Sequence, residues 1–106
     1  HAIETGVGYG EWLHGEAVAA GMVLAARLSE RIGLIGGADV ERLRTLLHRA
    51  GLPVDAPRLG YERYTALMSR DKKVVAGSIR FVLLDRLGAA RLCSNVPDVG
   101  LRAVLG

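Results

Sequence analysis

Residues 16–32 read EAVAAGMVLAARLSERI, and this stretch decides the fold of the chain. Its apolar side chains recur at the three- and four-residue spacing of an α-helix. Gly33 follows, and glycine readily takes the left-handed backbone conformation in which many α-helices end. Many residues within it are small, which lets other backbones approach the helix closely. We therefore predict a central, buried helix over residues 16–32.

Shorter elements are expected on the C-terminal side of this helix. Asp39 can cap a helix whose leucine-rich stripe ends before Gly51 and Pro53. The following segment holds two prolines and should be irregular. The remaining apolar patterns predict a short helix over residues 61–70 and a β-hairpin with strands at 78–85 and 89–93. A last helix is predicted over residues 98–105. The predicted fold class is mainly α, a multihelical domain with a small β-hairpin.

The composition fits one globular domain and excludes several classes of protein. With 106 residues, 50% of them hydrophobic and 24% charged, the chain is not a collagen, a coiled coil or a disordered segment. Its net charge of +3 is spread along the chain and only 5% of the residues are aromatic, so no nucleic-acid binding is expected. Residues 17–28 form the longest apolar stretch, which is too short to span a bilayer, so no membrane segment is expected.

The cysteine content and the first residue lead to expectations about the cellular compartment and about whether the chain is part of a longer protein. Cys93 is the single cysteine, so it can form no internal disulfide; we expect a buried thiol in a reducing cytoplasm. The chain starts at His1 rather than Met, and no secretion signal follows. We therefore expect a cytoplasmic protein of which this chain is a piece.

His14 is the first candidate for chemistry, because it lies directly before the predicted central helix. A histidine at a helix start feels the positive end of the helix dipole, which favours the neutral imidazole that a divalent metal requires. The following Gly15 has no side chain to crowd an ion. The alternative is a capping or core histidine, since the spacing between His1 and His14 matches no short metal-ligand motif. His48 is expected to be a surface or boundary residue.

Asp71, Lys72 and Lys73 form a second candidate at the end of the short helix. Two ammonium groups there could bind a phosphate or a carboxylate. A solvated turn is the alternative, because cations near a helix C-terminus are common and stabilising.

Two other motifs do not carry the chemistry that they suggest. Residues 14–16 are similar to the H-x-E element of zinc nucleoside deaminases, but the required P-C-x-x-C is missing, so Glu16 is expected only to favour the helix dipole. Residues 6–10 contain G-x-G-x-G without a preceding strand, so a dinucleotide-binding fingerprint is rejected.

Several stretches together resemble the 3-dehydroquinate synthase family, in the order in which that family has them. They are HAIE at 1–4, GYG at 8–10, LHGEAVAAGM at 13–22, DKK at 71–73, IRFVLL at 79–84, and Gly88. The likeness spans essentially the whole chain, and the run HGEAVAAGM is specific. It implies that residues 1–106 are the C-terminal helical domain of a phosphate-eliminating carbon–oxygen lyase. That enzyme of the shikimate pathway converts 3-deoxy-D-arabino-heptulosonate 7-phosphate into 3-dehydroquinate and phosphate, toward chorismate and the aromatic amino acids.

The resemblance also implies the roles of individual residues. The family binds NAD and a divalent metal, usually zinc and in some cases cobalt. The metal ligands of the family are a Glu and two His. His14 matches the second of these histidines, and the other two ligands would precede His1. His1 matches the last histidine of G-H-T-x-G-H-A-I-E, which is implicated in phosphate binding and in proton transfer during elimination. Lys72, in preference to Lys73, would reach the phosphate of the sugar phosphate substrate.

The family resemblance further implies a missing N-terminal domain and a homodimer. The NAD site would lie in that N-terminal domain, so no cofactor-binding residue is expected in this chain. The isolated chain is therefore expected to be inactive and to bind metal weakly, because one histidine cannot fix a tetrahedral site. The full-length enzyme is expected to be a homodimer.

Three alternatives remain beside the synthase. One is a related sugar-phosphate cyclase such as a 2-deoxy-scyllo-inosose synthase. Another is an iron-dependent alcohol or glycerol dehydrogenase, which also uses a histidine followed by glycine as a metal ligand; the DKK and HGEAVAAGM motifs favour the synthase. The third is a helical interaction module in which His1, His14 and the lysines are only surface or capping residues. An exposed apolar face would favour a severed domain over such a module.

Overall fold

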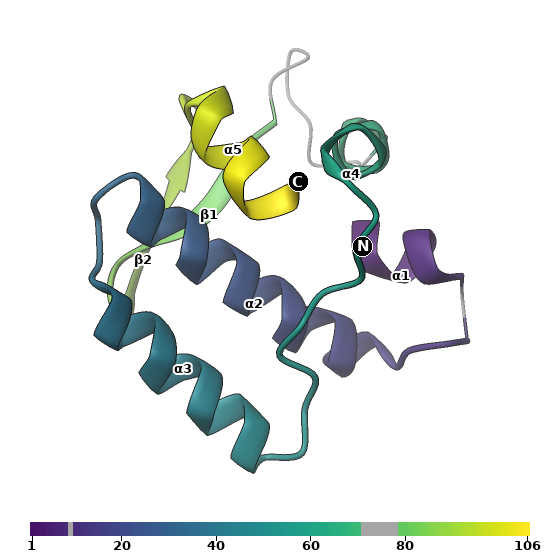
Figure 1. Ribbon diagram of the computed structural model, residues 1–106, viewed down its shortest axis with the longest axis horizontal. Helices are drawn as coiled ribbons and strands as arrows, with labels where there is room; N and C mark the ends of the chain where they lie inside the picture. Colours follow the sequence, from purple (N-terminus) through teal and green to yellow (C-terminus); the bar gives the residue numbers. More distant parts are fainter. Residues whose placement is uncertain (9, 71–78) are drawn as a thin grey trace.

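The computed structural model describes residues 1–8, 10–70 and 79–106, and in these residues it has five helices and one two-stranded sheet (Figure 1). The elements in chain order are α1 (Ala2–Val7), α2 (His14–Arg31), α3 (Gly37–Arg49), α4 (Tyr61–Ser69), β1 (Phe81–Arg86), β2 (Ala89–Cys93) and α5 (Asp98–Leu105). The mainly α fold class with a small hairpin is confirmed. No helix in the described ranges has the length and apolarity needed to cross a membrane.

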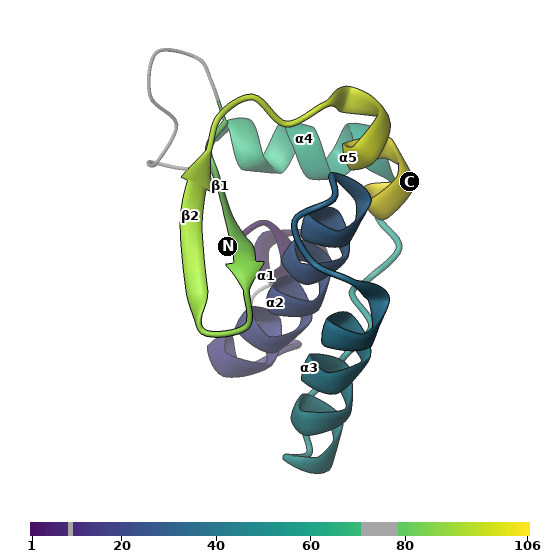
Figure 2. The ribbon, with the colours of Figure 1, turned by 90° about the vertical axis from the view of Figure 1, so that its left-hand side faces the viewer.

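The helix α2 is the element around which the others pack. It contacts α1, α3, α5 and β1, and the two views show α3 and the hairpin on different sides of it (Figures 1 and 2). Ala20 and Ala26 have no exposed surface, so the small residues do permit close approach. The prediction of a central helix is confirmed, although Val18 and Met22 on one face remain exposed.

The ends of α2 follow from its capping residues. The helix begins at His14, two residues earlier than expected, with Leu13 as its N-cap. Glu16, at the third helical position, accepts a hydrogen bond from the backbone N–H of Leu13 at 2.8 Å. This N–H has no carbonyl partner within the helix, so the Glu16 side chain satisfies it. After Arg31 the chain leaves the helix through Gly33, whose φ of 85° suits a residue without a Cβ.

Asp39 does not cap α3 in the way that the sequence suggested. The helix begins at Gly37 with Gly36 as its N-cap, and the Asp39 carboxylate accepts the Gly36 N–H at 3.4 Å from the third helical position. The helix therefore begins at the glycine pair Gly36 and Gly37, before Asp39. The expected end of the helix is confirmed, since Ala50 and Gly51 follow it.

The helix α1 has no counterpart among the elements expected from the sequence. It packs on both α2 and α4, with Ile3 buried in the main core. Gly6 faces Leu59 so closely that an added Cβ would lie 2.2 Å from the Leu59 Cδ1. Tertiary contacts therefore stabilise a six-residue helix that its own sequence would not.

The hairpin closes the other side of the core. Its strands are antiparallel and pair Phe81 with Cys93, with an irregularity between Leu84 and Arg86. Leu83 is fully buried in the main core. Cys93 is partly buried and packs against that core, so the expectation of a buried thiol holds only in part.

A buried hydroxyl joins the hairpin to α2. The Ser29 Oγ donates to the Ala25 carbonyl at 2.7 Å and accepts the backbone N–H of Leu84 at 2.9 Å. Ser29 has no exposed surface, and both hydrogen-bonding functions of its hydroxyl are used. This contact fixes the position of β1 along the helix.

Candidate functional site

His14 lies in the first turn of α2, at the end of the molecule where α1 also lies (Figure 1). Its side chain is 67% exposed, so the expectation of a helix-start histidine is confirmed and a core histidine is excluded. The Glu4 Oε1 of α1 lies 2.7 Å from the His14 Nδ1, and the Glu4 side chain is only 16% exposed. The chain thus presents an accessible imidazole that a neighbouring helix holds by one nitrogen.

The structure brings His1 next to His14. Their ring centroids are 6.2 Å apart and their planes are tilted by 32°. His1 precedes α1 and is exposed, and α1 contacts α2. The two histidines that the sequence singled out therefore share one exposed region, although α1 lies between them in the sequence.

The donor set around His14 suits one ligand of a metal site. Imidazole nitrogen is a preferred ligand of Zn²⁺, and metal-bound histidines usually pair their other nitrogen with a carboxylate or a carbonyl. The described residues include no group of three or more His, Cys, Asp or Glu side chains that could hold an ion. This part of the chain therefore fits a metal only as a contributor of one ligand.

The second candidate, Asp71 with Lys72 and Lys73, lies outside the residues that the structure describes. The helix that precedes it, α4, ends at Ser69 and packs against α1, the helix that follows His1. His48, the third histidine, is exposed on α3, as expected for a surface residue.

Two cavities lie on either side of α2, and neither matches the candidate residues as a group. One of about 260 Å³ has mostly apolar walls, with His1 at its edge. The other, of about 930 Å³, lies between α2, α3 and the segment 54–58 and is lined by Arg27, Arg44 and Arg58. His14 lines neither of these two cavities, whereas His1 lines the smaller one, so the two histidines do not share a pocket there.

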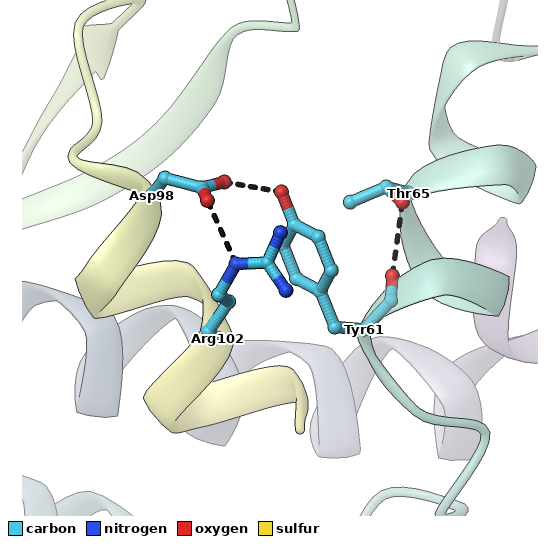
Figure 3. A network of polar contacts seen from close by, with 4 residues as sticks. All are labelled: Tyr61, Thr65, Asp98 and Arg102. Atoms are coloured by element: carbon cyan, nitrogen blue, oxygen red, sulfur yellow. Dashed lines mark hydrogen bonds and ion pairs between the residues drawn. The ribbon is translucent and has the colours of Figure 1, made fainter.

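A polar network that the sequence did not predict joins α4 to α5 (Figure 3). The Tyr61 hydroxyl donates to the Asp98 carboxylate, which also accepts from the Arg102 Nε at 2.8 Å. The Arg102 guanidinium lies 4.1 Å from the Tyr61 ring centroid, a cation–π arrangement. The hydrogen bond to Asp98 raises the pKa of Tyr61, and hydrogen bonds from Tyr61 and then Arg102 lower the pKa of Asp98.

Only part of this network could have been found in the sequence. The four-residue spacing of Asp98 and Arg102 on a predicted helix is a recognisable signal. Tyr61 is 37 residues away from Asp98, and nothing local indicates their contact.

Comparison with known proteins identifies the family. The sequence model described as 3-dehydroquinate synthase C-terminal matches residues 1–74, a range that includes both histidines of the exposed site. The chain belongs to the 3-dehydroquinate synthase family.

Proteins named 3-dehydroquinate synthase are close relatives of this family member. The protein from Nitrosospira multiformis is 55% identical over 105 residues, and the one from Neisseria meningitidis serogroup A is 59% identical over 105 residues. In both cases the match covers 99% of this chain and 29% of the relative. The chain thus spans less than a third of the length of these synthases.

A solved structure of a related enzyme has the same fold. It is a 2-epi-5-epi-valiolone synthase from Streptomyces hygroscopicus subsp. jinggangensis with NAD⁺ and Zn²⁺ bound, 28% identical in sequence. The TM-score is 0.79, and the match covers 92% of this chain and 27% of that one. The multihelical arrangement is therefore shared between this 3-dehydroquinate synthase family member and a second kind of synthase.

Proposed function

We propose that residues 1–106 are the C-terminal helical domain of a 3-dehydroquinate synthase whose NAD-binding domain precedes His1. The observation that carries this proposal is the identity of 55% and 59% to synthases of that name over nearly the whole chain. The complete protein would convert 3-deoxy-D-arabino-heptulosonate 7-phosphate into 3-dehydroquinate and phosphate. It would act in the shikimate pathway, and so in chorismate and aromatic amino acid biosynthesis, as a carbon–oxygen lyase.

His14 is proposed as one of three protein ligands of a divalent metal, zinc or cobalt. Its exposed ring, its place at a helix start and its carboxylate-bound Nδ1 support this role. The NAD⁺ and Zn²⁺ of the streptomycete synthase support the same cofactors here. When bound, the metal polarises substrate oxygens and NAD accepts a hydride temporarily, which makes a neighbouring proton acidic enough for phosphate to be eliminated.

His1 is proposed to contact the phosphate of the substrate and to take part in proton transfer. Its ring lies 6.2 Å from that of His14, so one small substrate could reach both imidazoles. A positioned imidazole can accept or donate a proton at the atoms that change charge during elimination. Lys72 would add a positive charge beside the leaving phosphate and stabilise the charge that it gathers.

The complete protein is proposed to act in the cytoplasm as a homodimer on a sugar phosphate. Large apolar side chains on the described surface support burial against further protein, either the missing domain or a second copy. They include Leu13, Val18, Met22, Val82 and Leu92.

A related sugar-phosphate cyclase is the second candidate. The likeness to the 2-epi-5-epi-valiolone synthase favours it, at a TM-score of 0.79. The sequence identity of 28% to that enzyme, against 55% and 59% to the dehydroquinate synthases, ranks it below the first candidate. The same overall chemistry on another sugar phosphate would use the same histidines.

The test is an assay of the complete protein with the heptulosonate 7-phosphate, NAD and zinc, in which both phosphate and 3-dehydroquinate are measured. Stoichiometric release of the two products supports the proposal, and turnover only with another sugar phosphate would favour the second candidate. The coding sequence directly upstream of His1 should contain G-H-T-x-G. The isolated 106-residue chain should bind zinc weakly and show no turnover, and turnover by that chain with added NAD and zinc would contradict the domain assignment.

A further inference from the structure

Glu4 has no chemical role of its own in the function proposed above, yet its carboxylate contacts the His14 Nδ1 at 2.7 Å. We propose that Glu4 is a positioning residue, which fixes the tautomer and the ring orientation of His14 so that Nε2 is the nitrogen available to the metal. This inference rests on the proposed role of His14 as a metal ligand.

The tautomer follows from the donor and acceptor chemistry of the pair. An ionised carboxylate can only accept hydrogen bonds, so the hydrogen in the 2.7 Å contact between the Glu4 Oε1 and the His14 Nδ1 belongs to Nδ1. A neutral imidazole has one N–H, and a metal binds the neutral ring. The lone pair is therefore on Nε2. Neutral imidazole without such a partner can take either tautomer, so the contact removes a choice that the ring would otherwise have.

The burial of the two partners indicates which of them holds the other. Glu4 is 16% exposed and projects from α1, which is anchored by the buried Ile3 and by the close packing of Gly6 on Leu59. The His14 side chain is 67% exposed. The carboxylate is thus the fixed member of the pair, and the imidazole is the member that is oriented.

Stability alone does not explain the contact. A surface ion pair or hydrogen bond of this kind contributes about 0–1 kcal/mol to folding. A carboxylate bound to the second nitrogen of a metal-ligating histidine typically changes metal affinity by about 10–100-fold. The neighbouring Glu16 makes a different contact, because its carboxylate accepts the backbone N–H of Leu13 at 2.8 Å.

The experiment compares variants of the complete protein by zinc affinity, measured in competition with a chelator. Glu4→Ala should bind zinc about 10–100-fold more weakly than the wild type. Glu4→Gln should lose less, because its carbonyl can still accept from Nδ1, and so should partly rescue the affinity. Glu11→Gln is the matched control: it removes an exposed carboxylate between α1 and α2 and should leave zinc affinity unchanged.

A second measurement reports the tautomer directly and without activity. In the zinc-free protein labelled with ¹⁵N-histidine, His14 should carry its hydrogen on Nδ1, and Glu4→Ala should shift it toward the Nε2–H form. A His14 ring with hydrogen on Nε2 in the wild-type protein would overturn the proposal, even if Glu4→Ala failed to fold.

The same variants separate this inference from the proposed function. His14→Ala should abolish tight zinc binding; if it does not, the ligand assignment of His14 fails, and the role of Glu4 fails with it. If His14→Ala loses zinc while Glu4→Ala retains both wild-type affinity and the Nδ1–H tautomer, only the role of Glu4 is wrong.

Discussion

The two ends of α2 differ in what surrounds them. At the N-terminal end the His14 ring is exposed to solvent and is held by one carboxylate from α1. At the C-terminal end Leu28 and Ser29 are buried, and the Ser29 hydroxyl bonds to β1. One helix therefore presents an exposed imidazole at one end and anchors the hairpin at the other.

This difference follows from the packing along the helix. The C-terminal half of α2 contributes Leu28 to the main core, where Leu83 of the hairpin and Leu101 of α5 meet it. The first turns contribute only the small Ala17 and Ala20 to that core and leave Val18 exposed. Changes at the exposed positions of the N-terminal end should thus cost little stability, and changes at the buried positions of the C-terminal end should cost more.

The largest expected effect is the loss of activity at the N-terminal end. His14→Ala in the complete protein should lower metal-dependent turnover by about 10³-fold, since several kcal/mol of charge stabilisation depend on the metal. The free energy of unfolding should stay within about 0.5 kcal/mol of the wild type, because the side chain is exposed. Steady-state kinetics and urea unfolding of the same preparation measure both quantities. Normal turnover would remove His14 from the metal site.

At the C-terminal end of α2, Leu83→Ala in the hairpin that packs there should destabilise the chain by about 2–5 kcal/mol, because truncating this fully buried side chain leaves a cavity. Val82→Ala, one residue earlier in the same strand, is the control: that side chain is 59% exposed, and its loss should cost less than about 1 kcal/mol. Urea unfolding followed by circular dichroism gives both values. Equal losses for the two variants would show that the hairpin does not pack on α2 as described.

Ser29→Ala tests the hydrogen bond between α2 and the hairpin. Removing the hydroxyl leaves the partly buried N–H of Leu84 without this acceptor, so we expect a loss of about 1–3 kcal/mol in the free energy of unfolding. Ser69→Ala is a matched control, because that exposed hydroxyl on α4 donates to the Thr65 carbonyl of its own helix. If the two variants unfold alike, Ser29 does not anchor β1.

The sequence predicted α2 and α3 because their periodicity and their terminal glycines are local signals. It did not predict α1, since that helix depends on contacts with α4 and with the distant Leu59. The site was predictable to the same extent. His14 could be found from its motif, but its pairing with Glu4 requires α1 to exist, and so no local pattern indicates it.

The smallest expected effect concerns the polar network of Tyr61, Asp98 and Arg102, which joins α4 to α5. The hydrogen bond between Tyr61 and Asp98 lowers the pKa of Asp98 below its ordinary 3.8 and raises the pKa of Tyr61 above its ordinary 10.0. A lowered carboxyl pKa stabilises the fold above pH 3.8, and that contribution disappears as the pH falls through the pKa of the folded state. A raised phenol pKa stabilises the fold below pH 10.0, and that contribution disappears as the pH rises through the folded value.

The stability difference between the wild type and Tyr61→Phe should therefore be constant between pH 3.8 and 10.0 and should shrink beyond both limits. Chemical unfolding at a series of pH values measures it. Burial raises the pKa of Tyr64 as well, but Tyr64 is present in both proteins and its contribution cancels in the difference. A difference that stays constant outside both limits would mean that the hydroxyl does not bind Asp98 in solution. The expected result would instead show that this hydrogen bond joins α4 to α5 in solution and contributes to the stability of the fold.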